Sequence, residues 1–288
     1  GLGDVYKRQV PWPEAPPQVS LETRSRTIRL VESGRLSSAA RSLVGQAKIA
    51  ETTPQIIAEL ESKHPSGPSS PFGPSLGPQP TKAPGLEELN LALKRFASDT
   101  APGVSGWTVP LLRQALKMPQ FGRFMVSLTA SMAKGTAPGA AMLCTSRLTP
   151  LLKPDGGVRP IAVGELFYRL ATKAILKAAF KPDFLLPNQL GVGSKGGVEP
   201  IVRAVERSLD GSLPQAYTHL VSLDFSNAFN TADRLDIAAS LRAHAPGAYR
   251  LAKWAYNGST DLLIGDHALK SAQGVRQGDP LGPLLFSL

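Results

Sequence analysis

A single carboxylate stands at the end of an apolar run in the stretch LVSLDFSNAFNTADR, which covers residues 220–234. The alternation of Val221 and Leu223 with a serine predicts a half-buried strand over 219–224 that ends on Asp224. Burying a carboxylate is costly unless a cation or several hydrogen-bond donors pair with it. Asp224 is therefore a candidate partner for a positive charge, and a polar turn containing Phe229 follows it.

A second segment carries side chains suited to phosphate. Lys153 and Arg159 flank a Pro-Asp-Gly-Gly turn at 154–157, and the apolar runs on either side of this turn predict a hairpin. Such a hairpin could aim both side chains to one side, where arginine makes bidentate contacts with phosphate and lysine makes a point-charge contact. The alternative is that both are exposed hairpin charges.

Two further segments, both containing glycine, could approach a phosphate or a nucleotide. In QGVRQGDPLGPLLF, residues 273–286, Asp279 is a natural N-cap with Pro280 at the first helical position, so Gln277 and Gly278 stand at a helix N-terminus that a nucleotide could approach. GVGSKG, residues 191–196, matches the dinucleotide fingerprint, but no buried strand precedes it. We therefore expect a loop whose amides approach a phosphate there, and no dinucleotide site.

Helical patterns dominate the elements that must position these residues. Strands and helices do not alternate strictly, which favours an α+β fold. From about residue 21 to 63 the pattern predicts helices, whereas the Pro-, Gly- and Ser-dense stretch 64–84 predicts a linker without means of packing a core. Further helices are expected at 86–97, 109–117, 121–134, 165–181, 199–209, 234–244 and 247–257, with a short hairpin around 265–266.

Charge and cysteine content narrow the function classes. The formal net charge of +10 and the isoelectric point near 9.9 favour a polyanionic partner. The single cysteine, Cys144, excludes an intrachain disulfide and a Cys-based zinc site. No apolar run approaches transmembrane length, so we expect an intracellular protein with no membrane partner. Basic residues cluster upstream of Asp224, although a solvated helix face explains that cluster equally well from charge alone: Arg147, Lys153, Arg159, Arg169, Lys173, Lys177 and Lys181.

Five segments, in this order, resemble the fingers and palm of a reverse transcriptase, and the likeness is closest to non-long-terminal-repeat (LINE-type, R2-like) retrotransposons. They are APGVSGWTVPLLRQAL, LKPDGGVRPIAVGELFYRLATK, NQLGVGSKGGVEPIV, LVSLDFSNAFNTADR and GVRQGDPLGPLLF. The resemblance covers roughly residues 85–288. It implies a right-hand polymerase fold with fingers and a partial palm built on an antiparallel sheet. It also implies an RNA template, a DNA primer or target, dNTPs and a nuclear location.

The resemblance also assigns roles to residues. Asp224 matches the family's first metal-binding aspartate, with the Phe225 backbone carbonyl facing the second of two Mg²⁺ ions, for which Mn²⁺ could substitute. Phe229 falls where the family keeps an aromatic ring that excludes a ribose 2′-hydroxyl; plain core packing is the alternative. The implied nucleotide-binding residues are Lys153, Arg159, Phe229, Gln277 and Gly278. The residues that could touch template phosphates, with a solvated face as the alternative, are Arg169, Lys173, Lys177 and Lys195.

The resemblance leads us to expect a truncated enzyme. We expect residues 1–9 to be a non-native leader, 10–63 a helical N-terminal segment, 64–84 a linker, and 85–288 the fingers and partial palm. The family's second catalytic element carries paired aspartates, and no Asp-Asp pair occurs in this sequence. We therefore expect a nucleotidyltransferase fragment that is inactive alone. The alternative from another class is a nucleic-acid-binding fragment or a decayed copy, and a group II intron maturase or a viral RNA polymerase is a weaker one.

Overall fold

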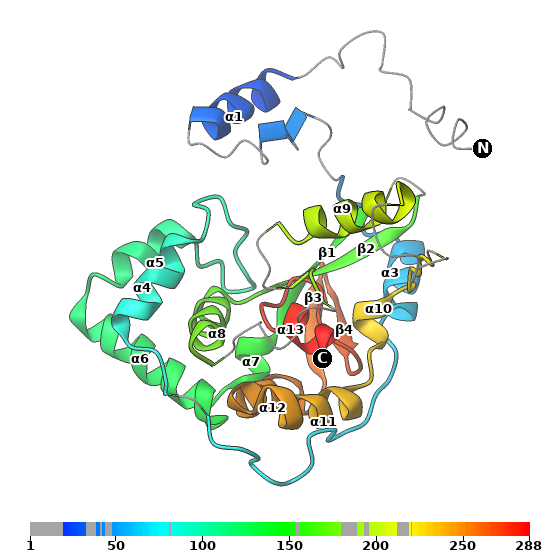
Figure 1. Ribbon diagram of the computed structural model, residues 1–288. Helices are drawn as coiled ribbons and strands as arrows, with labels where there is room; N and C mark the ends of the chain where they lie inside the picture. The colour runs from blue at the N-terminus through cyan, green and yellow to red at the C-terminus, as the bar shows by residue number, and fades with distance from the viewer. Residues whose placement is uncertain are drawn as a thin grey trace. The chain divides into compact units, whose positions relative to one another are not determined.

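The structure, a computed structural model, divides the chain into two compact units, Gly1–Lys48 and Ile49–Leu288 (Figure 1). In the first unit, helix α1 (Leu21–Glu32) buries Thr27 and Leu30, and the Thr27 hydroxyl lies 2.5 Å from that of Ser42. The sheet and all the candidate site residues belong to the second unit. The residues that the structure describes are 20–32, 39–40, 42–43, 48–80, 82–153, 156–179, 189–192, 196–211, 219 and 221–288.

The second unit is built on a four-stranded sheet with the order β2-β1-β3-β4. The strands are β1 (Ser146–Leu152), β2 (Val158–Gly164), β3 (Thr260–Ile264) and β4 (His267–Ser271). Both predicted hairpins are confirmed, since β1 pairs antiparallel with β2 and β3 with β4. However, β1 and β3 run parallel, so the expected antiparallel sheet is mixed instead. The contact between the two hairpins joins residues more than a hundred positions apart, and no local pattern encodes its direction.

The predicted helices form close to the expected positions, and the α+β class is confirmed. They are α3 (Pro54–Ser62), α4 (Leu86–Lys94), α5 (Val109–Ala115), α6 (Pro119–Lys134), α8 (Leu166–Ala179), α9 (Val198–Leu209), α11 (Arg234–His244), α12 (Tyr249–Tyr256) and α13 (Gly282–Ser287). Two short helices were not predicted, α7 (Ala140–Cys144) and α10 (Ala228–Thr231). Side-chain caps fix several starts: the Thr53 and Thr108 hydroxyls each accept a backbone N–H three residues on, and Asp233 caps α11. A left-handed Gly135 ends α6.

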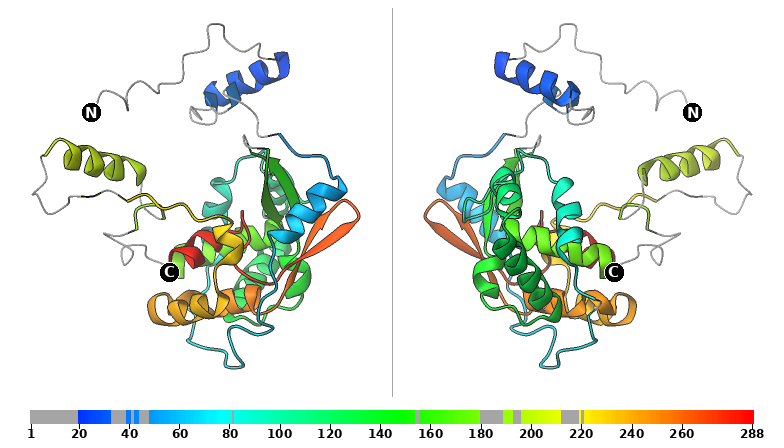
Figure 2. Two further views of the ribbon diagram at one scale, coloured as in Figure 1. Left: turned by 90° about the vertical axis from the view of Figure 1, so that its right-hand side faces the viewer. Right: turned by 90° about the vertical axis from the view of Figure 1, so that its left-hand side faces the viewer.

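Helix α8 belongs to two hydrophobic clusters of the second unit, whose sheet and helices Figure 2 shows from two opposite sides. One of its faces packs Leu166, Leu170 and Ala174 against α4, α5 and α6. Its opposite face packs Tyr168, Ala171 and Ile175 into a second cluster with α11, α12 and α13. A third cluster joins α3 to the sheet through Ile57 and Leu60, which lies beside the β3–β4 hairpin residue Leu269. The hairpin β1–β2 is therefore supported from one side by α3.

The segment 64–84, expected to be a linker, packs along α12 instead. Phe72 is only 3% exposed, and its ring meets that of Tyr249 edge-on at 5.5 Å. Backbone carbonyls of this segment accept hydrogen bonds from Arg250 and Lys253, which replace water as the donors. Composition alone misses this packing, because a Pro- and Gly-rich segment is held here by its carbonyl groups and by the single buried ring of Phe72. The compact unit accordingly begins at Ile49.

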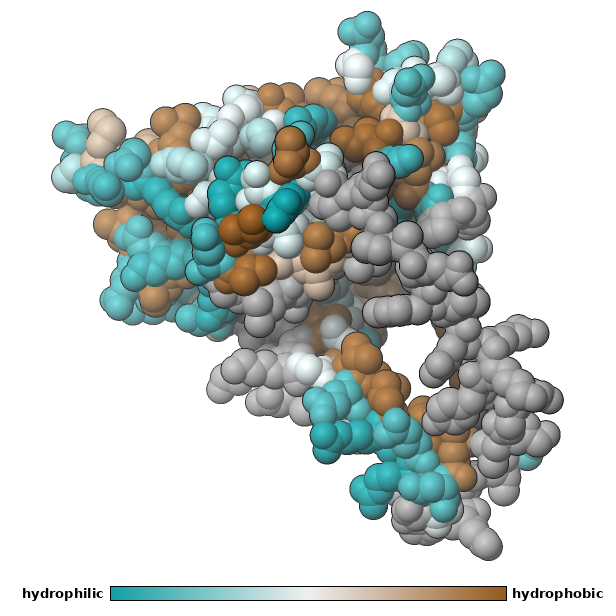
Figure 3. Space-filling model, turned by 90° about the horizontal axis from the view of Figure 1, so that it is seen from above, coloured by the Kyte–Doolittle hydropathy of each residue, from teal (hydrophilic) through white to brown (hydrophobic). Residues whose placement is uncertain are grey.

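Helix α9 lies at the surface with none of its residues buried. Its apolar residues include Val198 and Leu209, which are 73% and 64% exposed. The view from above shows hydrophobic and hydrophilic side chains side by side at the surface (Figure 3). Within the described part of the chain, none of the helices combines the length and the apolar character that crossing a membrane requires.

The thiol of Cys144 is expected to be unreactive in the folded chain. Burial raises its pKa from 9.0 to about 11, so the thiolate at pH 8 is about a hundredfold scarcer than for an exposed cysteine. We expect iodoacetamide to modify the native chain at least about a hundredfold more slowly than the chain unfolded in urea, as followed by mass spectrometry. Equal rates in the two states would show that Cys144 is accessible.

Candidate nucleotide site

The hairpin β1–β2 presents its basic residues on one face. In its register Leu151 pairs with Arg159, and the Lys153 amide donates to the Gly157 carbonyl at 2.7 Å. Since successive side chains alternate between faces, Lys153, Leu151 and Arg159 share a face of the hairpin. Lys153 and Arg159 are both exposed. The structure therefore places these two residues as the hairpin prediction requires, at the end of the sheet near the turn.

The Gln-Gly-Asp-Pro segment lies along the free edge of β2. The Ala162 amide donates to the Gln277 carbonyl at 2.7 Å. Gly278 has φ +105°, and a Cβ at this position would lie 2.8 Å from the Ala162 carbonyl oxygen, so only glycine fits. The same Cβ would contact the Ile161 side chain, which is on the face of β2 that carries Arg159. Gln277 and Gly278 are thus brought beside the basic hairpin.

A buried ionic cluster anchors the Gln-Gly-Asp-Pro segment. The Asp279 carboxylate accepts hydrogen bonds from the hydroxyls of Tyr168 and Tyr256 at 2.8–2.9 Å, and from the Arg276 guanidinium at 2.5 Å. Arg276 and Asp279 have side chains that are each only 2% exposed, so each charge depends on the other. The Leu281 amide also donates to Asp279, which fits the expected cap, although α13 begins two residues later than predicted.

A second buried arginine ties the preceding loop to the fold. Arg234 is 1% exposed, and its guanidinium donates to the backbone carbonyls of Gly274, Tyr256, Gly258 and Ser271. Burial lowers the pKa of Arg234 to about 10, which still leaves it charged at neutral pH. Sequence reasoning missed Arg234, Arg276, Tyr168 and Tyr256. The one available signal was that Arg276 stands in a glycine-containing stretch three residues before Asp279.

Phe229 is half-buried on α10 and is tied to the same loop. Its carbonyl accepts the Val275 amide at 2.6 Å, and its ring stacks on that of Phe286 at 4.6 Å between centroids. A Cβ on Gly274 would lie 2.2 Å from the Asn230 carbonyl carbon. The backbone of the loop therefore contacts the backbone of the Phe229 turn directly, and any side chain at position 274 would clash. This packing accommodates either role for the ring, as core or as sugar filter, and the assignment stays a prediction.

The strand expected at 219–224 is not present. Residues 221–225 are coil, and Val221, Leu223 and Phe225 are each more than 70% exposed. An alternating apolar pattern forms a strand only where a neighbouring strand pairs its backbone and a core covers one face, and neither occurs here. Asp224 is exposed, and within the described residues no hydrogen bond or ion pair holds its carboxylate. The roles of Asp224 and the Phe225 carbonyl in metal binding stay predictions.

The predicted template-binding residues have mixed surroundings. The Arg169 guanidinium donates to the Ala101 carbonyl and lies 5.6 Å from the centre of the Phe96 ring, above which the Lys173 ammonium also sits at 4.1 Å. Burial lowers the pKa of both groups. Both cations therefore anchor the loop before α5, whereas Lys177 is exposed. Lys195 lies outside the described residues.

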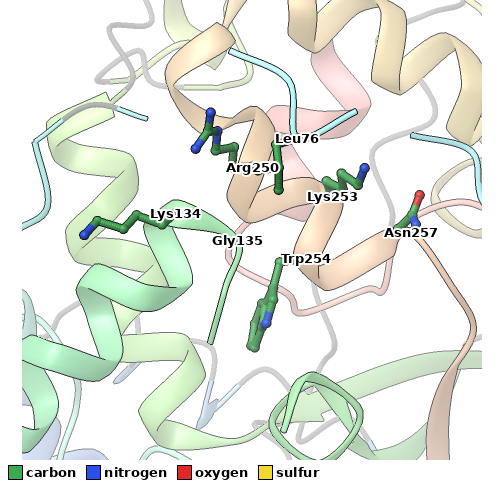
Figure 4. Close-up of a pocket in the computed structure, with 7 residues that line it drawn as sticks. All are labelled: Leu76, Lys134, Gly135, Arg250, Lys253, Trp254 and Asn257. Carbon is green, nitrogen blue, oxygen red and sulfur yellow. The ribbon is translucent and has the colours of Figure 1, made fainter. Parts of the chain in front are cut away.

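A separate cavity of about 220 Å³ lies between α6, α12 and the segment 64–84, lined by Leu76, Lys134, Gly135, Arg250, Lys253, Trp254 and Asn257. The charged ends of Lys134, Arg250 and Lys253 point in different directions (Figure 4). Arg250 and Lys253 already bind backbone carbonyls of residues 73–78. The cavity is thus a gap beneath a packed segment, and none of the predicted site residues lines it.

No family model matches the chain. It is 27% identical over 234 residues to the retrotransposable element SLACS 132 kDa protein of Trypanosoma brucei gambiense, covering 73% of this chain and 18% of that protein. It is 27% identical to the Pol polyprotein from the type-1 retrotransposable element R2 of Popillia japonica (70% and 29% covered). It is 28% identical to that from the type-2 element R2DM of Drosophila melanogaster (70% and 20% covered).

The chain spans less than a third of the length of each of these relatives. The aligned part includes most of the second unit, where the motifs lie, because the matches extend over 215–234 residues. The resemblance inferred from the motifs is confirmed at this level: the chain is related in sequence to the proteins of R2-like, non-LTR retrotransposons.

Proposed function

We propose that this chain forms the fingers and the first part of the palm of a reverse transcriptase that copies an RNA template into DNA. The observation that carries the proposal is the seating of Gln277 and Gly278 on the edge of β2, beside Arg159 and Lys153. Two distant segments then meet at β2, and the exposed charges of Lys153 and Arg159 lie on the hairpin to which the Gln277 segment is bound. The sequence relationship to retrotransposon Pol polyproteins supports the same function.

The chemistry of the proposed site follows from its residues. Lys153 and Arg159 bind the triphosphate and oppose the negative charge that develops during transfer. Gly278 allows its backbone to lie directly against the Ala162 carbonyl, which holds the Gln277 segment beside the hairpin to which the nucleotide binds. Phe229 excludes a sugar that carries a 2′-hydroxyl.

Magnesium fits the donors at the start of this turn. The Asp224 carboxylate and the Phe225 carbonyl are exposed oxygen donors, the type that Mg²⁺ prefers. When bound, the metal ions of such polymerases activate the primer hydroxyl and neutralise the triphosphate. Among the described residues no group of three or more acidic, His or Cys side chains gathers.

A second candidate is a nucleic-acid-binding fragment or decayed copy without activity. The net charge of +10, together with a lone exposed Asp224, favours it. Such a fragment would bind RNA and DNA alike, with an affinity that falls steeply with salt.

Primer extension by the full-length protein that contains this chain tests the proposal. We expect incorporation of dNTPs on an RNA template with Mg²⁺, and little incorporation of NTPs. Salt-sensitive RNA binding without any incorporation would favour the inactive fragment, and a preference for NTPs would favour a viral-type RNA polymerase.

A further inference from the structure

Helix α3 covers the free edge of β2 at the start of the strand, next to the turn between Lys153 and Arg159. The Val158 amide donates to the Glu59 carboxylate at 3.0 Å, and the Lys63 ammonium donates to the Val158 carbonyl. Glu59 and Lys63 pair with each other at 2.6 Å, one turn apart on the helix. Both polar groups of a single edge peptide are thereby bound by one ion pair.

Three of the outward-facing residues on the edge of β2 are covered, each in a different way. Val158 is bound by α3, Pro160 has no amide to donate, and the Ala162 amide binds Gln277. Edge strands need such covering because their unpaired groups would otherwise attract other chains. Here the covering has a second consequence, because Val158 directly precedes Arg159 and follows the turn that carries Lys153. The helix therefore fixes the strand at the residues proposed to hold the triphosphate.

The same helix end also reaches the turn that follows Asp224. The Asn227 side-chain amide donates to the Lys63 carbonyl at 2.8 Å. Asn227 has φ +54°, and no other non-glycine residue in the described part of the chain has a positive φ. Its side-chain carbonyl accepts the amide of the buried Asn230 side chain at 2.9 Å, which locks the turn leading to Phe229. A left-handed asparagine is strained, so these contacts are needed to maintain it.

Lys63 thus joins two segments that are far apart in sequence: its ammonium binds the hairpin and its carbonyl binds the turn. The Lys63 and Glu59 side chains are 21% and 33% exposed, which places the pair at the edge of solvent and not in the core. The hydrogen bond from Lys63, with that from the Val158 amide, lowers the pKa of Glu59. Glu59 therefore remains an acceptor throughout the neutral range.

We propose that Glu59 and Lys63 are positioning residues that hold the Lys153–Arg159 hairpin at a fixed distance from the Asn227–Phe229 turn. The triphosphate and the sugar of an incoming nucleotide are then bound by one preformed site. This proposal rests on the proposed polymerase function, and it gives residues 49–63 a role within the nucleotide site. A binding site that is already held in one geometry loses less conformational freedom when its ligand binds, so this brace of Glu59 and Lys63 has a measurable effect on nucleotide affinity.

Amide exchange in the 288-residue chain tests the brace without any assay of activity. In Glu59→Ala we expect exchange of the Val158 amide to become at least about tenfold faster, with the Asn230 amide accelerated as well through Lys63. Glu61→Ala is the matched control, because Glu61 is on the same helix and exposed, and it should change neither amide. Unchanged exchange at Val158, or acceleration at Val158 alone, would overturn the proposal.

Steady-state kinetics of the full-length protein test the positioning role. Glu59→Ala and Lys63→Met should each raise the KM for a dNTP about tenfold and alter kcat less than about twofold, while Lys63→Arg should restore most of the loss. Asn227→Gly removes the hydrogen bond to the Lys63 carbonyl without backbone strain. The double variant with Lys63→Met should have a KM little above that of either single variant, since each substitution breaks the same connection between the hairpin and the turn. Wild-type KM values in an active protein would contradict the role. A wild-type protein without incorporation would instead reject the polymerase function and leave the exchange result to decide on the brace.

Discussion

Asp279→Ala is expected to lower the free energy of unfolding by about 3–5 kcal/mol, the effect of removing one partner of a buried ion pair. The Arg276 guanidinium would lose its counter-charge in a site where its side chain is only 2% exposed. The Tyr168 and Tyr256 hydroxyls would lose their acceptor at the same time. Burial raises the pKa of both tyrosines well above the ordinary value, so both hydroxyls are neutral donors to Asp279 at neutral pH. The measurement is urea unfolding of the 288-residue chain followed by tryptophan fluorescence.

The chain offers a matched control in the exposed pair Lys270–Asp261. Its N–O distance is also 2.5 Å, but the two side chains are 62% and 38% exposed. Asp261→Ala should therefore cost less than about 1 kcal/mol, because solvent screens the pair. Equal losses for Asp279→Ala and Asp261→Ala would mean that the buried cluster does not hold the Gln277 segment.

Phe229→Ala is expected to reduce the preference for deoxyribonucleotides over ribonucleotides by about 10- to 200-fold, the range for removing a steric contact in a binding pocket. The ring is half-buried and anchored by stacking on Phe286, so its position is fixed relative to the Val275 and Gly274 backbone. The measurement is the ratio of kcat/KM for dCTP to that for CTP in primer extension by the full-length protein.

Phe286→Ala separates the two roles that Phe229 can have. It removes the stacking partner, which is 40% exposed, but keeps the Phe229 ring itself and its backbone contact with Val275. If Phe229 filters the sugar, Phe286→Ala should alter the dCTP-to-CTP ratio far less than Phe229→Ala. If Phe229 is only a packing residue, both variants should lower stability and neither should change the ratio.

Local signals explain which parts of the fold could be predicted. Thr53, Thr108 and Asp233 are cap residues whose hydrogen bonds form within three positions, and the corresponding helices begin where expected. The turns of both hairpins are equally local, and both hairpins form. The positions of Lys153 and Arg159 on one face follow directly from the register, so this part of the candidate site was within reach of the sequence.

Long-range contacts explain the rest. The hydrogen bond between Tyr168 and Asp279 spans 111 positions, and that between Asn227 and Lys63 spans 164, so no window of sequence contains either. The pattern at 219–224 predicts a strand, but strand formation depends on a partner that local sequence does not reveal. The prediction of a linker at 64–84 missed the packing of this segment, because the segment is bound through backbone carbonyls, which every sequence has.

Asp224 is the residue on which the polymerase function depends, and its substitution gives the most direct test. The measurement is the rate of single-nucleotide incorporation opposite an RNA template by the full-length protein, with Asp224→Asn compared with wild type and with Asp266→Asn, a control at the exposed β3–β4 turn. Loss of a charge that stabilises the transition state should reduce the rate by more than about 10²-fold in Asp224→Asn, with the control unaffected. Incorporation at the wild-type rate in Asp224→Asn would contradict the assignment of this chain to the catalytic part of a reverse transcriptase.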